Sequence, residues 1–208
     1  RTPIKPCLDG EPCYEQIAVQ FKPELGRFDD LDARKAAYWA VFAGAHGHTY
    51  GANGIFQFHV PSGPGEFEPI VSWQEALSFP GAGQLRHLRA LMESRPFLTR
   101  IPDQSLIAVG AGEGAHHVQA TRDEGGSYAM LYLPAAGQTV SVDTSKLSGK
   151  RLKAWWYNPR TGKAAAQEGE FPVGGELSFT SPEEEGPDRV LVLDDAARGF
   201  GPPGRGRP

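Results

Sequence analysis

The order of strand-like and helix-like segments changes once along this chain, near Pro102-Asp103, and this change constrains the fold more than any other feature. Before it, the segments run strand, helix, strand, helix, which is typical of a parallel sheet or barrel. After it, short strand-like segments alternate with turn signals, which is typical of an antiparallel β-sandwich. We therefore expect an α/β domain over residues 1–102 and a β-sandwich over residues 103–196.

Two long helices are predicted in the first part. A run of alanines follows the acidic residues 29–32 and ends at Gly44, which predicts a helix over 32–43. Leucines recur at helical spacing after Pro80, and that helix should end near Ser94 because Pro96 disfavours helix at the residue before it. The remaining elements expected here are strands at 4–8 and 46–50, a glycine-rich loop after the second strand, and a short helical turn at 73–77.

Seven strand-like segments follow, and glycine-rich or proline-containing turns separate them. They are residues 105–109, 116–121, 127–133, 138–143, 151–158, 176–180 and 189–193, with one more possible strand after the turn at 158–163. The last residues, 197–208, are mostly Gly, Pro and Arg and should be disordered.

Composition argues against several classes of function. The net charge is only −4, and no basic stripe points to nucleic acid. No apolar run is long enough to span a membrane. Cys7 and Cys13 lack the spacing and the companions of a metal site, and could form a disulfide or remain free thiols. Neither G-x-S-x-G nor a P-loop is present, and no cofactor is expected.

The main catalytic candidate is Glu11. The strand-like segment at 4–8 leads into Asp9-Gly10, and Pro12 then restricts Glu11 to extended conformations. A carboxylate at the end of a strand is where parallel α/β folds keep their chemistry. The alternative is a surface turn with incidental acids. Glu15 is the second candidate and is expected to bind or support rather than react, while Asp9 is interpreted as a cap of the turn.

His48, Tyr50 and Asn53 are predicted to lie at the end of the second strand, beside the end of the first. Polar and aromatic groups there could hydrogen-bond hydroxyls and stack on a sugar ring. The alternatives are a satisfied buried histidine for His48 and a turn residue for Asn53. His46 and His48 would share one face of a strand, but no third ligand accompanies them, so no metal site is predicted.

The Trp155-Trp156-Tyr157 run in the second part could form a carbohydrate-stacking platform. On a strand, Trp155 and Tyr157 face one side and Trp156 the other, so at least part of the run belongs to the core. Core is the preferred interpretation.

Several stretches together resemble the C-terminal part of the apiosidase-like glycoside hydrolases, which are bacterial enzymes with a (β/α)8 TIM barrel. The stretches are residues 8–15, 33–39, 48–57, 73–82 and 94–96. Residues 127–132, 153–162 and 190–194 are similar to a β-sandwich called the "putative collagen-binding domain of a collagenase". The resemblance covers nearly the whole chain apart from the tail.

This resemblance implies that residues 1–102 are the last two βα units of the barrel, with Glu11 as the nucleophile at the end of the seventh strand. The general acid/base would come from an earlier strand, outside this chain, which starts at Arg1 and reads as a piece of something longer. It also implies a carbohydrate substrate, a sugar subsite that includes Tyr14, Glu15, His48, Tyr50, Asn53 and Trp73, and a secreted or periplasmic location. The collagen-binding label carries little weight, since nothing in the sequence indicates collagen recognition.

We therefore expect a fragment of a retaining glycoside hydrolase that acts on plant-type polysaccharide side chains and is inactive on its own. The alternative is a non-catalytic carbohydrate- or collagen-binding protein that uses the β-sandwich and the face of Trp155 and Tyr157.

Overall fold

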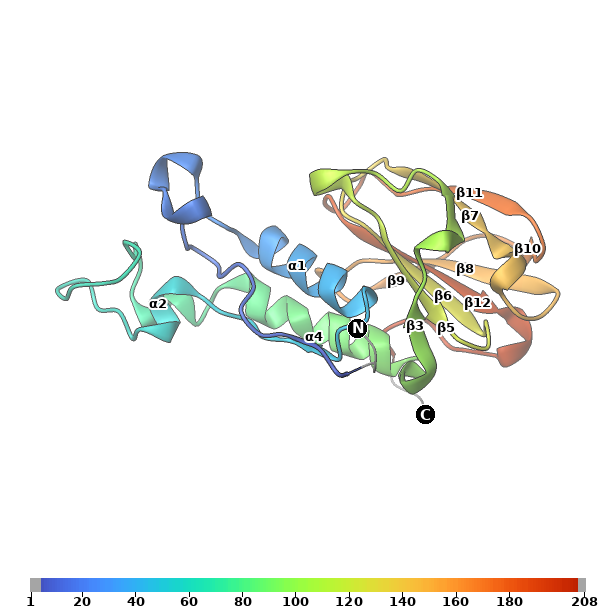
Figure 1. Cartoon of the computed structure of the whole chain (residues 1–208), viewed down its shortest axis with the longest axis horizontal. Coiled ribbons are helices and arrows are strands. Elements are labelled where there is room, and N and C mark those ends of the chain that lie inside the picture. The colour runs from blue at the N-terminus through green and yellow to red at the C-terminus, as the bar shows by residue number, and fades with distance from the viewer. Residues whose placement is uncertain (1–4, 206–208) are drawn as a thin grey trace. The chain divides into compact units, whose positions relative to one another are not determined.

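The computed structural model describes residues 5–205, and the chain divides into two compact units (Figure 1). The first unit comprises the residues up to Val41 together with Ala45–Arg86. The second comprises Phe42–Gly44 and the residues from His87 on. The boundary between the two units falls within helix α4 (Pro80–Glu93). In the sequence, by contrast, the change from mixed helix and strand signals to strand signals alone comes near residue 102.

The first unit is built on two short parallel strands. β1 (Leu8–Asp9) pairs with β2 (Gly47–His48), so that Leu8 lies opposite Gly47 and Asp9 opposite His48. Parallel neighbours need a crossover, and helix α1 (Asp30–Phe42) provides it. Both predicted strands are present but shorter than expected, and Ile4 lies outside the described residues.

The helices of this unit follow the sequence pattern. In α1 the small and aromatic residues Ala33, Ala37 and Tyr38 are buried, and Arg34 is buried with them because it bonds Asp30 and Gln84. The predicted turn at 73–77 is α3 (Trp73–Ala76), which Ser72 begins with a capping box. Helix α2 (Asn53–Phe56) was not predicted, since its sequence reads as a glycine-rich loop.

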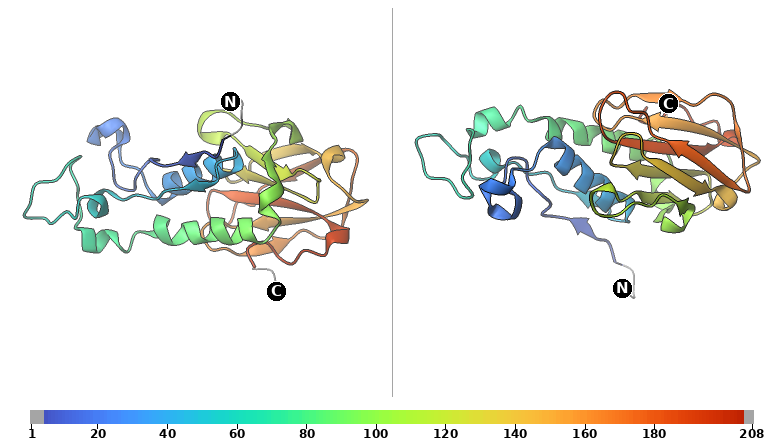
Figure 2. Two further views of the ribbon diagram at one scale, coloured as in Figure 1. Left: turned by 60° about the horizontal axis from the view of Figure 1, so that its bottom comes forward. Right: turned by 90° about the horizontal axis from the view of Figure 1, so that it is seen from above.

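The second unit is a sandwich of two antiparallel sheets, as predicted, and Figure 2 shows its strands side by side. The larger sheet has the order β10 (Phe171–Pro172), β8 (Arg151–Tyr157), β12 (Arg189–Asp195), β6 (Tyr128–Leu133), β5 (Gln119–Asp123), β3 (Arg100–Pro102), with β9 (Ala164–Ala166) also paired to β8. The smaller sheet has the order β11 (Glu176–Thr180), β7 (Thr139–Asp143), β4 (Ile107–Val109). The seven predicted segments all contain a strand, while β3 and β10 were missed because they are only two or three residues long.

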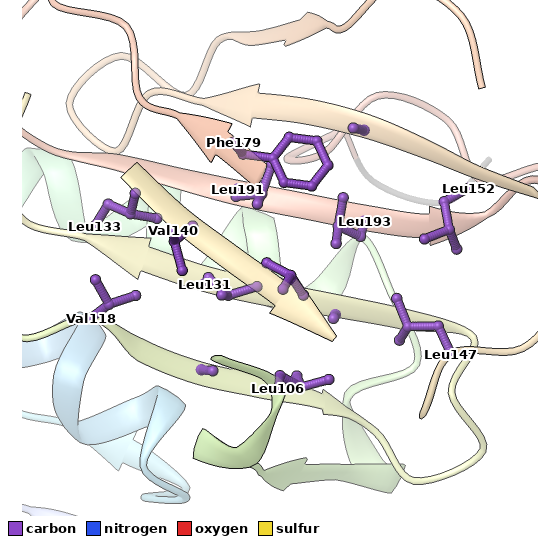
Figure 3. Close-up of a cluster of buried hydrophobic side chains, with 14 of the residues drawn as sticks. Leu106, Val118, Leu131, Leu133, Val140, Leu147, Leu152, Phe179, Leu191 and Leu193 are labelled. Atoms are coloured by element: carbon purple, nitrogen blue, oxygen red, sulfur yellow. The ribbon is translucent and has the colours of Figure 1, made fainter. Parts of the chain in front are cut away.

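Alternating side chains from both sheets fill the sandwich core (Figure 3). Val140 and Val142 of β7 point inward, whereas Thr139 of the same strand is exposed. They meet Leu131 of β6 and Leu191 of β12. Strands with period-two burial of this kind pack face to face, and the core is what stabilises the unit.

The other face of the larger sheet is also covered, and residues 87–96 contribute to this cover within the same unit. The Tyr157 hydroxyl donates to the backbone oxygen of His87 at 2.8 Å, and the Tyr128 hydroxyl donates to that of Pro96 at 3.0 Å. Leu88 and Leu91 of α4 are buried. These contacts place the second half of α4 against the larger sheet of the sandwich.

The expectation of a disordered tail does not hold for the described residues of 197–205. The Phe200 ring lies 4.9 Å from the Arg95 guanidinium, which donates to the Gly201 oxygen at 3.0 Å, and Pro203 is buried. Composition missed this order because a few specific contacts to one buried arginine hold the segment. Residues 206–208 lie outside the described part of the chain.

Candidate active site

The ends of the two parallel strands bring together a carboxylate and an imidazole. Asp9 Oδ2 lies 2.8 Å from His48 Nδ1, and the His48 side chain is only 4 % exposed. A carboxylate oxygen accepts, so Nδ1 carries the proton. The sequence-based reading of Asp9 as a simple turn cap missed this pair, because it depends on the register that places residue 9 opposite residue 48.

Glu11 follows β1 by two residues and is exposed. It lines a cavity of about 670 Å³ that is formed by the loop after β1, the residue Phe28 before α1, helix α2 and the loop after it. The walls are largely aromatic and come from Tyr14, Phe21, Phe28, Phe56 and Phe67. An exposed carboxylate therefore stands at the rim of a cavity large enough for a small ligand.

Glu15, by contrast, is buried, with 3 % exposure. Its Oε2 accepts hydrogen bonds from the Tyr50 hydroxyl at 2.5 Å and from the Gly81 amide, in the first turn of α4, at 3.0 Å. Burial raises the pKa of the Glu15 carboxyl, and the two hydrogen bonds oppose that rise. Its backbone also bonds Gly51 and Asn53, so Glu15 ties the loops after β1 and β2 to α4.

Tyr50 supplies a hydrogen-bond donor to the buried carboxyl of Glu15. Burial and the hydrogen bond to Glu15 raise the pKa of the Tyr50 hydroxyl, so it stays protonated and acts as a donor. The sequence placed Tyr50 near the catalytic candidate, but only the fold shows that its hydroxyl is engaged by Glu15.

Asn53 is 1 % exposed, and its amide is fully engaged. Its Nδ2 donates to the backbone oxygens of Phe67 at 3.1 Å and Gln16 at 3.4 Å, and its Oδ1 accepts from Gln57 at 2.7 Å. Asn53 therefore joins the loop after β1 to the loop after α2.

The last two predicted residues lie at different places. Tyr14 lines the cavity and contacts the Phe56 ring edge-on at 5.9 Å, and a side chain at Gly51 would overlap its ring. Trp73 lies at the start of α3, where its ring meets Phe58 at 6.0 Å. Glu11 and Tyr14 thus share the cavity, whereas Trp73 is not among its lining residues.

Neither a metal site nor a membrane segment is found in the described part of the chain. No three His, Cys, Asp or Glu side chains there are grouped so that they could hold a metal ion. None of the helices described is both long and apolar enough to cross a membrane. Cys7 and Cys13 are free thiols, and burial raises the pKa of Cys13 to about 11.

Sequence reasoning missed the aromatic walls of the cavity. Phe21, Phe28, Phe56 and Phe67 are spread over loops and a single-turn helix, where no periodicity marks them. The available signal was the density of phenylalanine in loop-like sequence between residues 21 and 67. Exposed aromatic side chains in loops favour binding over packing.

The tryptophan run of the sandwich does not form an open platform. Trp156 is part of the core, as preferred from its sequence, and Tyr157 is fully buried with its hydroxyl bonded to His87. Only Trp155 is partly exposed. In the alternative function, a binding protein would use the face of Trp155 and Tyr157, but only Trp155 is available on that face.

Two family models match the chain. Residues 1–99 match the model described as "Apiosidase-like, catalytic domain", and residues 101–194 match that of the "Putative collagen-binding domain of a collagenase". The resemblance seen in the sequence is thus confirmed. A search of curated proteins found no match.

Solved structures agree with the family models. One described as "Glycoside hydrolase" is 41 % identical, with a TM-score of 0.85, over 95 % of this chain and 44 % of its own. A glycoside hydrolase family 5 protein from Bacteroides vulgatus ATCC 8482 is 39 % identical, with a TM-score of 0.89, over 97 % of this chain and 44 % of its own. A "putative glycoside hydrolase" from the same organism shares the fold alone, at 14 % identity and a TM-score of 0.56, over 92 % of this chain and 36 % of its own. The chain spans less than half the length of these structures.

Proposed function

We propose that the chain is part of a glycoside hydrolase, because residues 1–99 match the apiosidase-like catalytic domain and residues 101–194 match the collagen-binding domain family. In this proposal the whole enzyme cleaves glycosidic bonds in plant-type polysaccharide side chains by a retaining mechanism, and Glu11 is the nucleophile. We further propose a secreted or periplasmic location, where such a substrate is found.

The observation that carries the proposal is the exposed carboxylate of Glu11 directly after a parallel strand, at the rim of an aromatic cavity. In (β/α)8 barrels, catalytic groups come from the carboxyl ends of the strands. The unit β1–α1–β2 followed by α4 supports the reading as the last two βα units of such a barrel. The relatives' greater length is consistent with earlier strands outside this chain.

In the proposed mechanism, Glu11 attacks the anomeric carbon as the bond to the leaving-group oxygen breaks. A second carboxylic acid, supplied by the rest of the catalytic domain, protonates that oxygen. It then deprotonates a water molecule, whose oxygen displaces Glu11 from the glycosyl–enzyme intermediate. Glu11 must be accessible to the substrate, which its exposed position allows.

The other site residues take supporting roles in this proposal. Tyr14, which lines the cavity beside Glu11, contacts the sugar, and His48 at the end of β2 and Trp73 at the start of α3 complete the proposed sugar subsite. Glu15, Tyr50 and Asn53 hold the loops that carry Glu11 and Tyr14, because their polar groups are already engaged within the protein.

The direct test is Glu11→Gln in the full-length enzyme. It should lower kcat at least 100-fold while leaving folding and substrate binding largely intact, because the amide keeps the shape but is a poor nucleophile. Glu24→Gln, an exposed glutamate outside the cavity, is the matched control and should leave kcat unchanged. Retention of more than about a tenth of the wild-type kcat in Glu11→Gln would show that Glu11 has another role.

The 208-residue chain by itself should not hydrolyse glycosides, since it holds only part of the proposed barrel and lacks the second carboxylic acid. Purified chain is assayed against apiose- and arabinose-type glycosides. Specific hydrolysis that disappears in Glu11→Gln would instead mean that the acid lies within these residues, with Glu15 the first candidate.

A further inference from the structure

The cavity beside Glu11 offers few hydrogen-bonding groups. Among the side chains that line it, the strong donors and acceptors are those of Glu11, Gln20 and Tyr14. The remaining walls are phenylalanine rings, Ile17, Ala18 and other weakly polar or apolar groups. Few protein groups here can bond the hydroxyl groups of a ligand, whereas the rings can remove the apolar surface of a ligand from water.

The aromatic rings form a continuous wall. Phe21 and Phe67 lie 4.8 Å apart between ring centroids, with an interplanar angle of 31°. Phe67 is 6.4 Å from Phe56, which in turn lies 5.9 Å from Tyr14. Phe21 nevertheless remains 65 % exposed, and Phe56 and Phe67 each 44 %. Packing within the chain therefore does not account for these rings.

The backbone at both loop tips is unfavourable for the residues it carries. Phe21 has φ 60° and Phe67 has φ 57°, and their neighbours Gln20 and Glu68 also have positive φ, at 54° and 49°. Bulky side chains seldom adopt this left-handed region, and such residues cluster at ligand-binding sites. A glycine at either position would remove the strain, yet both positions present a ring to the cavity.

Two buried or partly buried side chains hold the strained loops together. Arg27 donates from Nη1 to the Gln16 oxygen at 2.7 Å and from Nη2 to the Glu68 oxygen at 2.9 Å. Asn53 likewise links the oxygens of Gln16 and Phe67. Each side chain joins the loop after β1 to the loop after α2, so the aromatic wall is preorganised rather than formed by the ligand.

We propose that this cavity is a subsite for a sugar ring that carries few free hydroxyl groups, such as an O-methylated sugar, presented beside Glu11. The inference deepens the proposed function and rests on it for the role of Glu11. The apolar faces and methyl groups of such a ring fill the aromatic wall, and its remaining hydroxyls bond Gln20 and Tyr14. The volume of about 670 Å³ suits a ring with its substituents.

The test is binding to the 208-residue chain, without turnover, of methyl β-D-xylopyranoside and of its 2,3-di-O-methyl derivative. NMR titration gives both affinities, and shifts of the Ile17 methyl resonances report whether binding occurs in the cavity. The O-methylated sugar should bind at least fivefold more tightly. Equal affinity, a preference for the unmethylated sugar, or no binding of either would overturn the proposal.

Phe21→Gly separates a binding role from a structural one. It removes the ring and relieves the left-handed strain, so the chain should be as stable as the wild type or more stable, while the preference for the O-methylated sugar disappears. Phe67→Ala should also lose the preference. Leu77→Ala, which removes an equally exposed side chain outside the cavity, should bind within twofold of wild type.

The binding assay also separates this inference from the proposed catalytic role. Glu11→Gln keeps the cavity, so it should bind the O-methylated sugar as the wild-type chain does. If the 208-residue chain shows no preference for the O-methylated sugar while hydrolysis by the full-length enzyme depends on Glu11, only the subsite is rejected. If the chain shows the preference while full-length Glu11→Gln keeps full activity, only the catalytic role is rejected.

Discussion

The hydroxyl of Tyr50 donates to the buried carboxyl of Glu15 across 2.5 Å, and this bond joins the segments that follow the two parallel strands. Since Glu11 lies four residues before Glu15 in the same segment, the position of the proposed nucleophile depends on this contact. The carboxyl oxygen that Tyr50 contacts also accepts from the Gly81 amide.

Tyr50→Phe should therefore destabilise the chain by about 1–3 kcal/mol, because the buried carboxyl loses one of two donors while the ring still fills its space. Urea unfolding of the 208-residue chain measures the change. In the full-length enzyme, kcat should fall as well, since the Glu11 segment loses a tether. An unchanged unfolding free energy would show that water replaces the hydroxyl.

Two glycines in α4 offer a matched comparison. A Cβ atom added at Gly81 would overlap the Glu15 carboxyl, whereas a Cβ atom added at Gly83 would meet no neighbouring atom. Gly81→Ala should destabilise by about 2–3 kcal/mol, because it displaces a buried hydrogen-bonded group. Gly83→Ala should stabilise by up to about 1 kcal/mol, because alanine favours helix.

Thermal or urea unfolding of both variants checks this pair. The two glycine-to-alanine substitutions should change the free energy of unfolding in opposite directions. If Gly81→Ala proved as stable as Gly83→Ala, the close packing of Glu15 against the start of α4 would not hold in solution.

A buried ion pair stabilises the second unit. Arg95 donates from Nε and Nη2 to the two carboxylate oxygens of Asp194 at 2.8 and 2.6 Å, and both side chains are nearly inaccessible. Arg95→Ala should destabilise by about 3–5 kcal/mol, because it leaves the buried Asp194 carboxylate without its charge partner. It should also release residues 199–205, which hydrogen–deuterium exchange can follow.

Arg89→Ala is the control for that variant. Arg89 pairs with Glu93 at 2.7 Å, but its side chain is 79 % exposed, so the loss should stay below about 0.5 kcal/mol. Similar losses in the two variants would mean that burial does not set the strength of the Arg95 pair.

Asp103 should make stability depend on pH in the acid range. Burial alone would raise its pKa, but hydrogen bonds from Ser105, Arg122 and Lys146 outweigh that effect and lower the pKa to about 2, from an ordinary value of 3.8. A lowered pKa contributes stability that is present above pH 3.8 and is lost as the pH falls toward 2. The contribution should be about 1–2 kcal/mol, allowing for partial solvent screening.

Urea unfolding of wild type and Asp103→Asn between pH 7 and pH 2 tests this. Wild type should be the more stable at pH 7, and the difference should shrink below pH 4 and vanish near pH 2. A difference that stays constant over the whole range would show that the carboxylate charge contributes nothing.

Local patterns in the sequence determined much of this protein. Helix and strand signals alternate before residue 102 and only strand signals follow it, which predicted an α/β segment and a β-sandwich. This was possible because side-chain periodicity and turn residues determine secondary structure within a few positions of the chain. The same kind of reasoning singled out Glu11 as the proposed nucleophile, since a glycine, a proline and the end of an apolar segment surround it. The helices 32–43 and 80–94 were predicted from their alanines and leucines, and the structure has them as α1 and α4.

Only the tertiary structure decided what surrounds Glu11. The pairing of Asp9 with His48 depends on the register of two strands 39 positions apart, and the aromatic wall depends on loops that meet through Arg27 and Asn53. Positive φ at Phe21 and Phe67 contradicts the preferences of those residues, so no local rule could predict it. Such features arise where long-range contacts outweigh local preference, and the free energy of those contacts is absent from any short stretch of sequence.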